Sequence, residues 1–136
     1  MADVTVALRW GGEGLTFRGG KVGGPEVLVD GDGAEGQSPM TSLLLGLAGC
    51  MAADVVMILG KMKLPLAGME VVVEGDRRPE PPRRYTAIRL RYVVSGLAAA
   101  DEPKVRRAID LSRETYCSVL HSLRDDIGIS IDLEMR

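Results

Sequence analysis

The sequence predicts an α+β protein whose elements follow the order β-β-β-α-β-β-α-β. Three observations lead to this class. Short segments with alternating apolar and polar residues come in groups bounded by glycine or proline, a long apolar segment begins at Ser38, and an amphipathic segment begins at Asp101. Grouped strands predict antiparallel hairpins rather than a doubly wound parallel sheet. The length of 136 residues fits a single domain, here residues 1–136.

The N-terminal third is expected to form a small antiparallel meander. Residues 4–10 alternate strictly, with the apolar residues from Val4 to Trp10 on one face, which is the pattern of a half-buried strand. Two further strands are expected at residues 15–19 and 25–30, each bounded by glycines. A flexible, glycine-rich loop is expected to follow them.

The long apolar segment predicts a helix that runs from Pro39 to about Lys63. Ser38 is suited to cap it, and Pro39 to its first turn, where a missing backbone N–H costs nothing. The segment is close to the shortest length that spans a membrane, but it contains Asp54 and several glycines and alanines, and no second span accompanies it. A buried central helix is therefore the better interpretation.

The second half of the chain predicts a hairpin, a helix and a closing strand. The hairpin strands are expected at residues 68–75 and 85–94, on either side of a proline-broken connection. A helix is expected from Asp101 to near Asp126, followed by an alternating strand at residues 128–134. The stripe of the helix consists of Val105, Ile109, Ser112, Tyr116, Val119 and Leu123.

The first helix has more apolar surface than this short chain easily covers. It is apolar on nearly every side, and only one other helix and about six strands are available to pack against it. The simplest solution is a homodimer.

The net charge and the first ten residues indicate which partners and which compartment to expect. The net charge of −2 gives no electrostatic reason to expect nucleic acid or an anionic membrane surface. The first ten residues carry an acid and lack the cationic and apolar regions of a signal peptide, so a cytoplasmic protein is expected. In that compartment the two cysteines are not expected to form a structural disulfide.

The residue pattern does not support a metal site, a phosphate-binding loop or a Ser/His/Asp hydrolase. One histidine and two cysteines that stand 67 positions apart give no metal-ligand spacing. The Gly20-Lys21 pair lacks the other residues of a phosphate-binding loop, and no Gly-x-Ser-x-Gly elbow accompanies His121. Neither a metal nor an organic cofactor is expected.

The two thiols remain as candidates for chemistry. Cys50 lies about three turns into its helix, too far for the helix N-terminus to favour a thiolate, and Asp54 on the same face opposes one. Cys117 has Arg113 and His121 four residues away on either side, which favour a thiolate. The residues alone leave two interpretations open, a redox-active pair or two small buried apolar side chains.

The chain resembles the OsmC/Ohr family, which comprises osmotically inducible protein C and the organic hydroperoxide resistance proteins. The resemblance rests on "SPM…LLLGLAGC…DVV", on "YCSV" 67 residues further along, and on the proline-broken hairpin and closing strand. It covers nearly the whole chain, from Trp10 to Glu134. It implies an intertwined homodimer in which antiparallel sheets wrap two long central helices, with two active sites at the subunit interface.

The resemblance also implies an activity. Cys50 is expected to attack the O–O bond of an organic hydroperoxide and become a sulfenic acid, which Cys117 resolves by forming a disulfide. A dithiol such as dihydrolipoamide, on a lipoylated protein, is expected to reduce that disulfide. Leu, Met, Gly and Ala around Cys50 suit the organic part of the substrate.

One part of the family pattern is missing. The peroxidases use an arginine from the N-terminal strands to lower the pKa of the first thiol, and a glutamate after the helix-start proline holds it. Arg18 is the candidate for this arginine, and Arg9 is a weaker one. Met40 and Thr41 occupy the positions where the glutamate is expected, and Glu35 in the preceding loop is a weak substitute.

Two alternatives to a thiol peroxidase therefore stay open. The protein binds an apolar small molecule between its subunits, or acts as a redox-responsive partner, without turnover. In the other alternative, both thiols are inert core residues.

Overall fold

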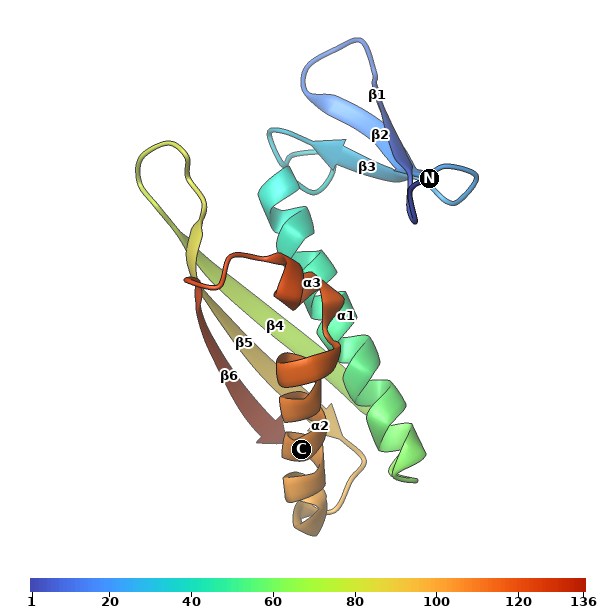
Figure 1. The fold of residues 1–136 in the computed structure, drawn as a ribbon, viewed down its shortest axis with the longest axis vertical. Coiled ribbons are helices and arrows are strands. Elements are labelled where there is room, and N and C mark those ends of the chain that lie inside the picture. Colours follow the sequence, from blue (N-terminus) through green and yellow to red (C-terminus); the bar gives the residue numbers. More distant parts are fainter. The chain divides into compact units, whose positions relative to one another are not determined.

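The structure is a computed structural model that describes all of residues 1–136 and contains two compact units, Met1–Leu43 and Leu44–Arg136 (Figure 1). The predicted α+β class and the order of strands and helices are confirmed. The single domain over residues 1–136 stays a prediction. Because the site lies within Leu44–Arg136, this second unit is described more fully.

The N-terminal unit contains the predicted meander. Its three strands form one antiparallel sheet in the order β1-β2-β3. The expectation that β1 is half-buried was wrong, because all five of its residues are exposed: it is an edge strand whose faces no second layer of its unit covers. The strands are β1 (Val6–Trp10), β2 (Thr16–Lys21) and β3 (Val27–Asp30).

The loop after β3 is organised around one carboxylate. Asp30 is buried and accepts hydrogen bonds from the backbone N–H groups of Asp32, Ala34 and Glu35, at 2.9, 3.1 and 2.9 Å. These bonds to the ionised carboxylate lower the pKa of Asp30. The glycine-rich segment therefore forms a loop held by hydrogen bonds to Asp30, and its flexibility stays a prediction.

Helix α1 (Pro39–Lys61) begins at the predicted cap. The Ser38 hydroxyl accepts a hydrogen bond from the Thr41 N–H at 3.1 Å and donates one to the Thr41 hydroxyl at 2.8 Å. The helix ends two residues earlier than expected, and Lys63 then takes a left-handed conformation with φ of 60°. By length and composition alone α1 is apolar enough to cross a membrane, a test that the core helix of a soluble protein also passes.

The sheet of the second unit has the order β4-β5-β6. The predicted hairpin of β4 and β5 is confirmed, but the closing strand β6 pairs parallel to β5, so the expectation of purely antiparallel sheets was wrong. A long helical connection lies between β5 and β6, and such a crossover permits the parallel pairing. The strands are β4 (Gly68–Arg77), β5 (Tyr85–Ser95) and β6 (Gly128–Met135).

The predicted second helix is not continuous. Its stripe ran through Tyr116, but the chain makes a π-helical turn before Cys117 and then leaves the helix, and Tyr116 is 57% exposed. Cys117 itself has an extended backbone, with φ of −72° and ψ of 100°. The segments are a 3-10 turn (Ala99–Asp101), α2 (Glu102–Leu111), the π-helical turn (Ser112–Tyr116) and α3 (Ser118–Ser122).

The core of the second unit lies between its sheet and two helices. Figure 1 shows α1 and α2 on the same face of the β4-β5-β6 sheet. Every fourth residue of the central part of α1 is completely buried there, which is the i, i+4 stripe of a helix face. The fully buried apolar residues of α1, β5 and α2 are Leu47, Met51, Val55, Leu59, Ile88, Leu90, Tyr92, Val94, Val105 and Ala108.

The other side of α1 is apolar but exposed. Leu45, Val56 and Met57 are 55%, 52% and 59% exposed in this single chain. Soluble proteins rarely leave such a contiguous apolar helix face uncovered. The homodimer stays a prediction, and this exposed helix face is the surface that the second copy is expected to cover.

Candidate functional site

Cys50 lies on the inner side of α1, between that helix and the segment that follows α2. Its side chain is half-buried, while Leu47 and Met51 on either side of it are completely buried. The sequence places it eleven residues after Pro39, well beyond the first turn, so the dipole of its own helix contributes little to its chemistry.

Cys117 lies at the break between the π-helical turn and α3. Its backbone N–H donates to the Ser112 carbonyl at 2.8 Å, and its own carbonyl accepts from the His121 N–H at 3.1 Å. Its Sγ atom caps α3 by accepting the Leu120 N–H at 3.4 Å. The side chain is completely buried. Cysteine thus occupies a position that usually belongs to a serine, threonine or aspartate cap.

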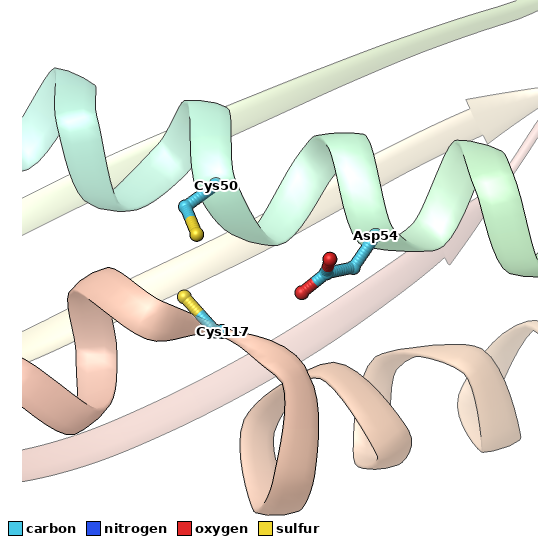
Figure 2. Close-up of side chains that lie close together, drawn as sticks. All are labelled: Cys50, Asp54 and Cys117. Atoms are coloured by element: carbon cyan, nitrogen blue, oxygen red, sulfur yellow. The ribbon is translucent and has the colours of Figure 1, made fainter. Parts of the chain in front are cut away.

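The two sulfur atoms face one another across the space between α1 and the Cys117 turn (Figure 2). The sulfurs of Cys50 and Cys117 and a carboxylate oxygen of Asp54 all lie within 4.8 Å of one another. Both thiols are free. A disulfide requires an S–S distance of about 2 Å, so the two sulfurs must move closer together for the bond to form.

Asp54 is held beside the thiols by a hydrogen bond from the other helical segment. The Ser112 hydroxyl, which is completely buried, donates to the Asp54 Oδ2 atom at 2.8 Å. The Tyr92 hydroxyl is also buried and makes no hydrogen bond. Burial, followed by the nearby Cys117 and Asp54, raises the pKa of Tyr92 far above its usual value, so it is a neutral donor.

The surroundings keep Cys117 protonated. Burial raises the pKa of its thiol to about 11, and the neighbouring Cys50 and the negative charge of Asp54 add to the rise, which the Leu120 N–H opposes. The charged side chains that shift this pKa carry only negative charge. Cys117 is therefore a neutral thiol at physiological pH.

Arg113 and His121, which were expected to favour a thiolate at Cys117, have other contacts in the structure. Arg113 and His121 are both exposed, the His121 Nε2 atom lies 3.0 Å from the Arg113 carbonyl, and the Arg113 guanidinium donates to the Ile129 carbonyl. The expectation was wrong because it assumed a continuous helix, in which residues four apart share a face. The break at Cys117 removes that relation.

A pocket with a mainly apolar lining adjoins the thiol site. Asp54 belongs to both, whereas neither Cys50 nor Cys117 is among the residues that line the pocket. The other residues come from the end of α1 and from the second helical segment. The pocket lining consists of Asp54, Met57, Ile58, Lys61, Met62, Leu111 and Tyr116.

Comparison with known proteins identifies the family. The family model described as OsmC-like protein matches residues 31–132. The chain is also 41% identical over 124 residues to Protein YhfA of Escherichia coli K12, which covers 90% of this chain and 92% of YhfA. The chain belongs to the OsmC-like family.

Solved structures agree with this assignment. A hypothetical protein from Aquifex aeolicus has a TM-score of 0.87 at 29% identity, covering 100% of this chain and 98% of its own. An organic hydroperoxide resistance protein OsmC from Legionella pneumophila has a TM-score of 0.70, covering 98% of each chain. At 12% identity this second likeness shows the OsmC-like fold alone.

The arginine expected from the OsmC-like pattern lies in the N-terminal unit. Arg18 is an exposed residue of β2 and stands opposite Arg9 of β1 in the sheet. Arg9 forms a salt bridge with Glu26, whereas Arg18 forms none within Met1–Leu43. Of the two candidates, Arg18 is therefore the one whose guanidinium is not already paired in its own unit.

Sequence reasoning did not assign Asp54, Ser112 and Tyr92 to the site. The i, i+4 spacing of Cys50 and Asp54 did indicate that they share a helix face. Ser112 was expected in the apolar stripe of the second helix and Tyr92 falls in the strand expected at residues 85–94, and both are buried. A polar residue on a buried face is the sequence signal that could have identified both residues, because a buried hydroxyl needs a hydrogen-bond partner.

Proposed function

We propose that this OsmC-like protein is a thiol peroxidase that reduces organic hydroperoxides in the defence against oxidative stress. The observation that carries the proposal is the approach of Cys50 and Cys117, whose sulfurs lie within 4.8 Å although they are 67 positions apart in the sequence. Relatives that share the fold include organic hydroperoxide resistance proteins. Cys50 is the more accessible thiol and is assigned the attack.

In the first step, the Cys50 thiolate attacks the terminal oxygen of the hydroperoxide. The O–O bond breaks, the substrate leaves as an alcohol after taking up a proton, and Cys50 becomes a sulfenic acid. The pocket beside Asp54 offers the organic group apolar contacts with Met57, Met62 and Leu111. Hydrogen peroxide has no such group, so the organic substrate is preferred.

In the second step, the Cys117 sulfur attacks the Cys50 sulfur. The S–O bond breaks and water leaves with the proton of Cys117, which gives the disulfide. Because Cys117 is a neutral thiol, its proton must be taken up as the S–S bond forms. The Asp54 carboxylate, held by Ser112, is the base nearest to it.

An external dithiol completes the cycle. One of its thiolates attacks the disulfide, a mixed disulfide forms, and its second thiol releases the reduced protein. A dithiol of the dihydrolipoamide type, carried on a lipoylated protein, suits this role because it closes its own ring on oxidation. No cofactor bound to the protein takes part in these steps.

Arg18 is assigned to the activation of Cys50. An arginine close to a thiol favours the thiolate, which is the nucleophile. Met40 and Thr41 replace the glutamate that holds this arginine in the family's peroxidases, and the Thr41 hydroxyl is already bonded to Ser38. Arg18 must therefore act without that partner.

We further propose a cytoplasmic homodimer. The exposed apolar face of α1, which includes Leu45 and Val56, is the surface that a second copy covers. A reducing compartment keeps Cys50 and Cys117 available as thiols between turnovers.

The experiment follows the consumption of cumene hydroperoxide and of hydrogen peroxide by the reduced protein with a dithiol. Wild type is expected to consume the organic peroxide faster than hydrogen peroxide, and Cys50→Ser to lose turnover. Cys117→Ser, assayed with no dithiol, should consume one equivalent and keep Cys50 as a sulfenic acid. Serine is a good cap for α3, so Cys117→Ser keeps the fold. A wild type no faster than Cys50→Ser overturns the proposal.

A second function is favoured by the electrostatics of the site. Asp54 opposes negative charge on Cys117, and the glutamate of the peroxidases is replaced by Met40 and Thr41. A protein that binds an apolar molecule in the pocket beside Asp54, or responds to redox state without turnover, needs no thiolate. The peroxide experiment separates the two, because only the peroxidase makes consumption depend on Cys50.

A further inference from the structure

The thiol site also contains a convergent set of metal-ligand atoms. Cys50 and Asp54 stand four residues apart on α1, so both side chains leave the same face of the helix. Cys117 approaches them from the break before α3, and Figure 2 shows both sulfurs and the carboxylate directed into one space. All three donor atoms lie within 4.8 Å of one another.

The donor set indicates which ion would bind. Two thiolates and one carboxylate suit Zn²⁺, whereas Mg²⁺ and Ca²⁺ take oxygen ligands. In a tetrahedral zinc site, Zn–S bonds of about 2.3 Å and Zn–O bonds of about 2.0 Å separate neighbouring ligand atoms by roughly 3.5 Å. Each donor atom therefore needs to move by about an ångström or less toward the other two to reach this spacing. Three protein ligands leave the fourth position open.

The groups around the three donors also fit a bound ion. The Ser112 hydroxyl fixes the Asp54 carboxylate through one oxygen at 2.8 Å and leaves the other oxygen free. The Leu120 N–H supports the Cys117 sulfur at 3.4 Å. The buried Tyr92 hydroxyl, near enough to Cys117 and Asp54 to feel their charge, makes no hydrogen bond.

We propose that the reduced protein binds one Zn²⁺ per chain through Cys50, Asp54 and Cys117, with Ser112 orienting the carboxylate. Binding requires both thiols and releases their protons. A disulfide removes two of the three ligands, so the oxidised protein cannot hold the ion. Zinc and the peroxide therefore compete for the same two sulfurs. The site rests on the geometry of the donors, and it stands whether or not the protein turns over peroxide.

The test is anaerobic titration of the reduced full chain with Zn²⁺ in competition with a chromophoric chelator, and with Co²⁺ as a spectroscopic probe. One ion per chain and a thiolate-to-cobalt charge-transfer band typical of tetrahedral sites are expected. Disulfide-oxidised protein is expected to bind none. Absence of stoichiometric binding by the reduced wild type overturns the site.

The role of Asp54 is tested by substitution. Asp54→Asn is expected to weaken zinc binding at least tenfold, and Asp54→Cys, which keeps a ligand at the position, to bind as tightly as wild type or more tightly. Asp110→Asn, an exposed acid on α2, is the matched control and should bind as wild type does. Unchanged binding by Asp54→Asn, or loss of binding by a folded Asp54→Cys, contradicts the three-ligand site.

Failure of this proposal is distinguishable from failure of the proposed function. Zinc binding without peroxide consumption removes the peroxidase and keeps the site. Peroxide consumption without zinc binding removes the site and keeps the peroxidase.

Discussion

The thiol pair and the candidate activating arginine occupy contrasting surroundings. Cys117 is completely buried, and the groups near it are fixed by hydrogen bonds from Ser112 and Leu120 within Leu44–Arg136. Arg18 is an exposed residue of a small sheet in Met1–Leu43 and has no salt bridge there. The pairing of the thiols is therefore a property of one packed unit. The activation proposed for Cys50, in contrast, depends on Arg18, which forms no salt bridge in its own unit.

The sharpest prediction concerns the different roles of the two thiols. In Cys117→Ser, one equivalent of cumene hydroperoxide should convert Cys50 into a sulfenic acid that persists, because no second thiol removes it. Trapping with dimedone and measurement of intact mass check this result. The Cys50→Ser variant should give no adduct. Equal labelling of both variants contradicts the assignment of Cys50 as the attacking thiol.

Loss of Arg18 is expected to have the next largest effect. Arg18→Met is expected to lower the rate of peroxide consumption at neutral pH about tenfold, because a cation near a thiol favours the reactive thiolate. The deficit should shrink as pH rises, because the thiolate then forms without help. Stopped-flow consumption of peroxide over a range of pH measures this. Arg9→Met, which removes an arginine already paired with Glu26, is the control, and an equal loss there argues against Arg18.

The buried thiol predicts a pH dependence in both reactivity and stability. With a pKa of about 11, against 9.0 for an ordinary thiol, Cys117 should react with iodoacetamide only slowly at pH 8 in the presence of a chelator. The folded protein binds the Cys117 proton more tightly than the unfolded chain does. The protonated thiol therefore stabilises the fold fully below pH 9.0, and this stabilisation is lost as pH rises toward about 11. Asp54→Asn removes a charge that raises the pKa, so alkylation should become faster. Alkylation of wild-type Cys117 as fast as that of a free thiol contradicts its burial.

Removal of the Ser112 hydroxyl should have the smallest effect. Ser112→Ala leaves the Asp54 carboxylate without its buried donor and is expected to cost about 1–3 kcal/mol in the free energy of unfolding. Urea denaturation measures the change. Ser118→Ala removes a hydroxyl from an exposed residue of α3 and should cost much less. Equal costs for the two variants contradict the importance of the Ser112–Asp54 hydrogen bond.

Local sequence signals were enough to predict most elements. The cap at Ser38, the strand alternation and the proline-broken hairpin all act within a few residues, and the corresponding elements are present. The parallel pairing of β6 was not predictable, because an alternating strand looks the same in either direction. The break at Cys117 was hidden for a related reason: residues on both sides of it keep helical spacing.

The site was predictable only in part. The resemblance to the OsmC-like family indicated Cys50 and Cys117, but metal-ligand spacing excluded them as ligands because they are far apart in the sequence. The fold removes that objection by bringing Cys117 to the face of α1 that carries Cys50 and Asp54. The hydrogen bond from Ser112 to Asp54 joins residues 58 positions apart, and no local pattern reveals such a contact.

The central claim is that Cys50 and Cys117 act as one redox pair within a single chain. The most direct measurement is peptide mapping of the chelator-treated wild type after one equivalent of cumene hydroperoxide, with the remaining thiols alkylated before digestion. A redox pair within one chain should give an intrachain Cys50–Cys117 disulfide and the loss of both thiols together. Two intact thiols, or a disulfide that links two chains, would contradict it.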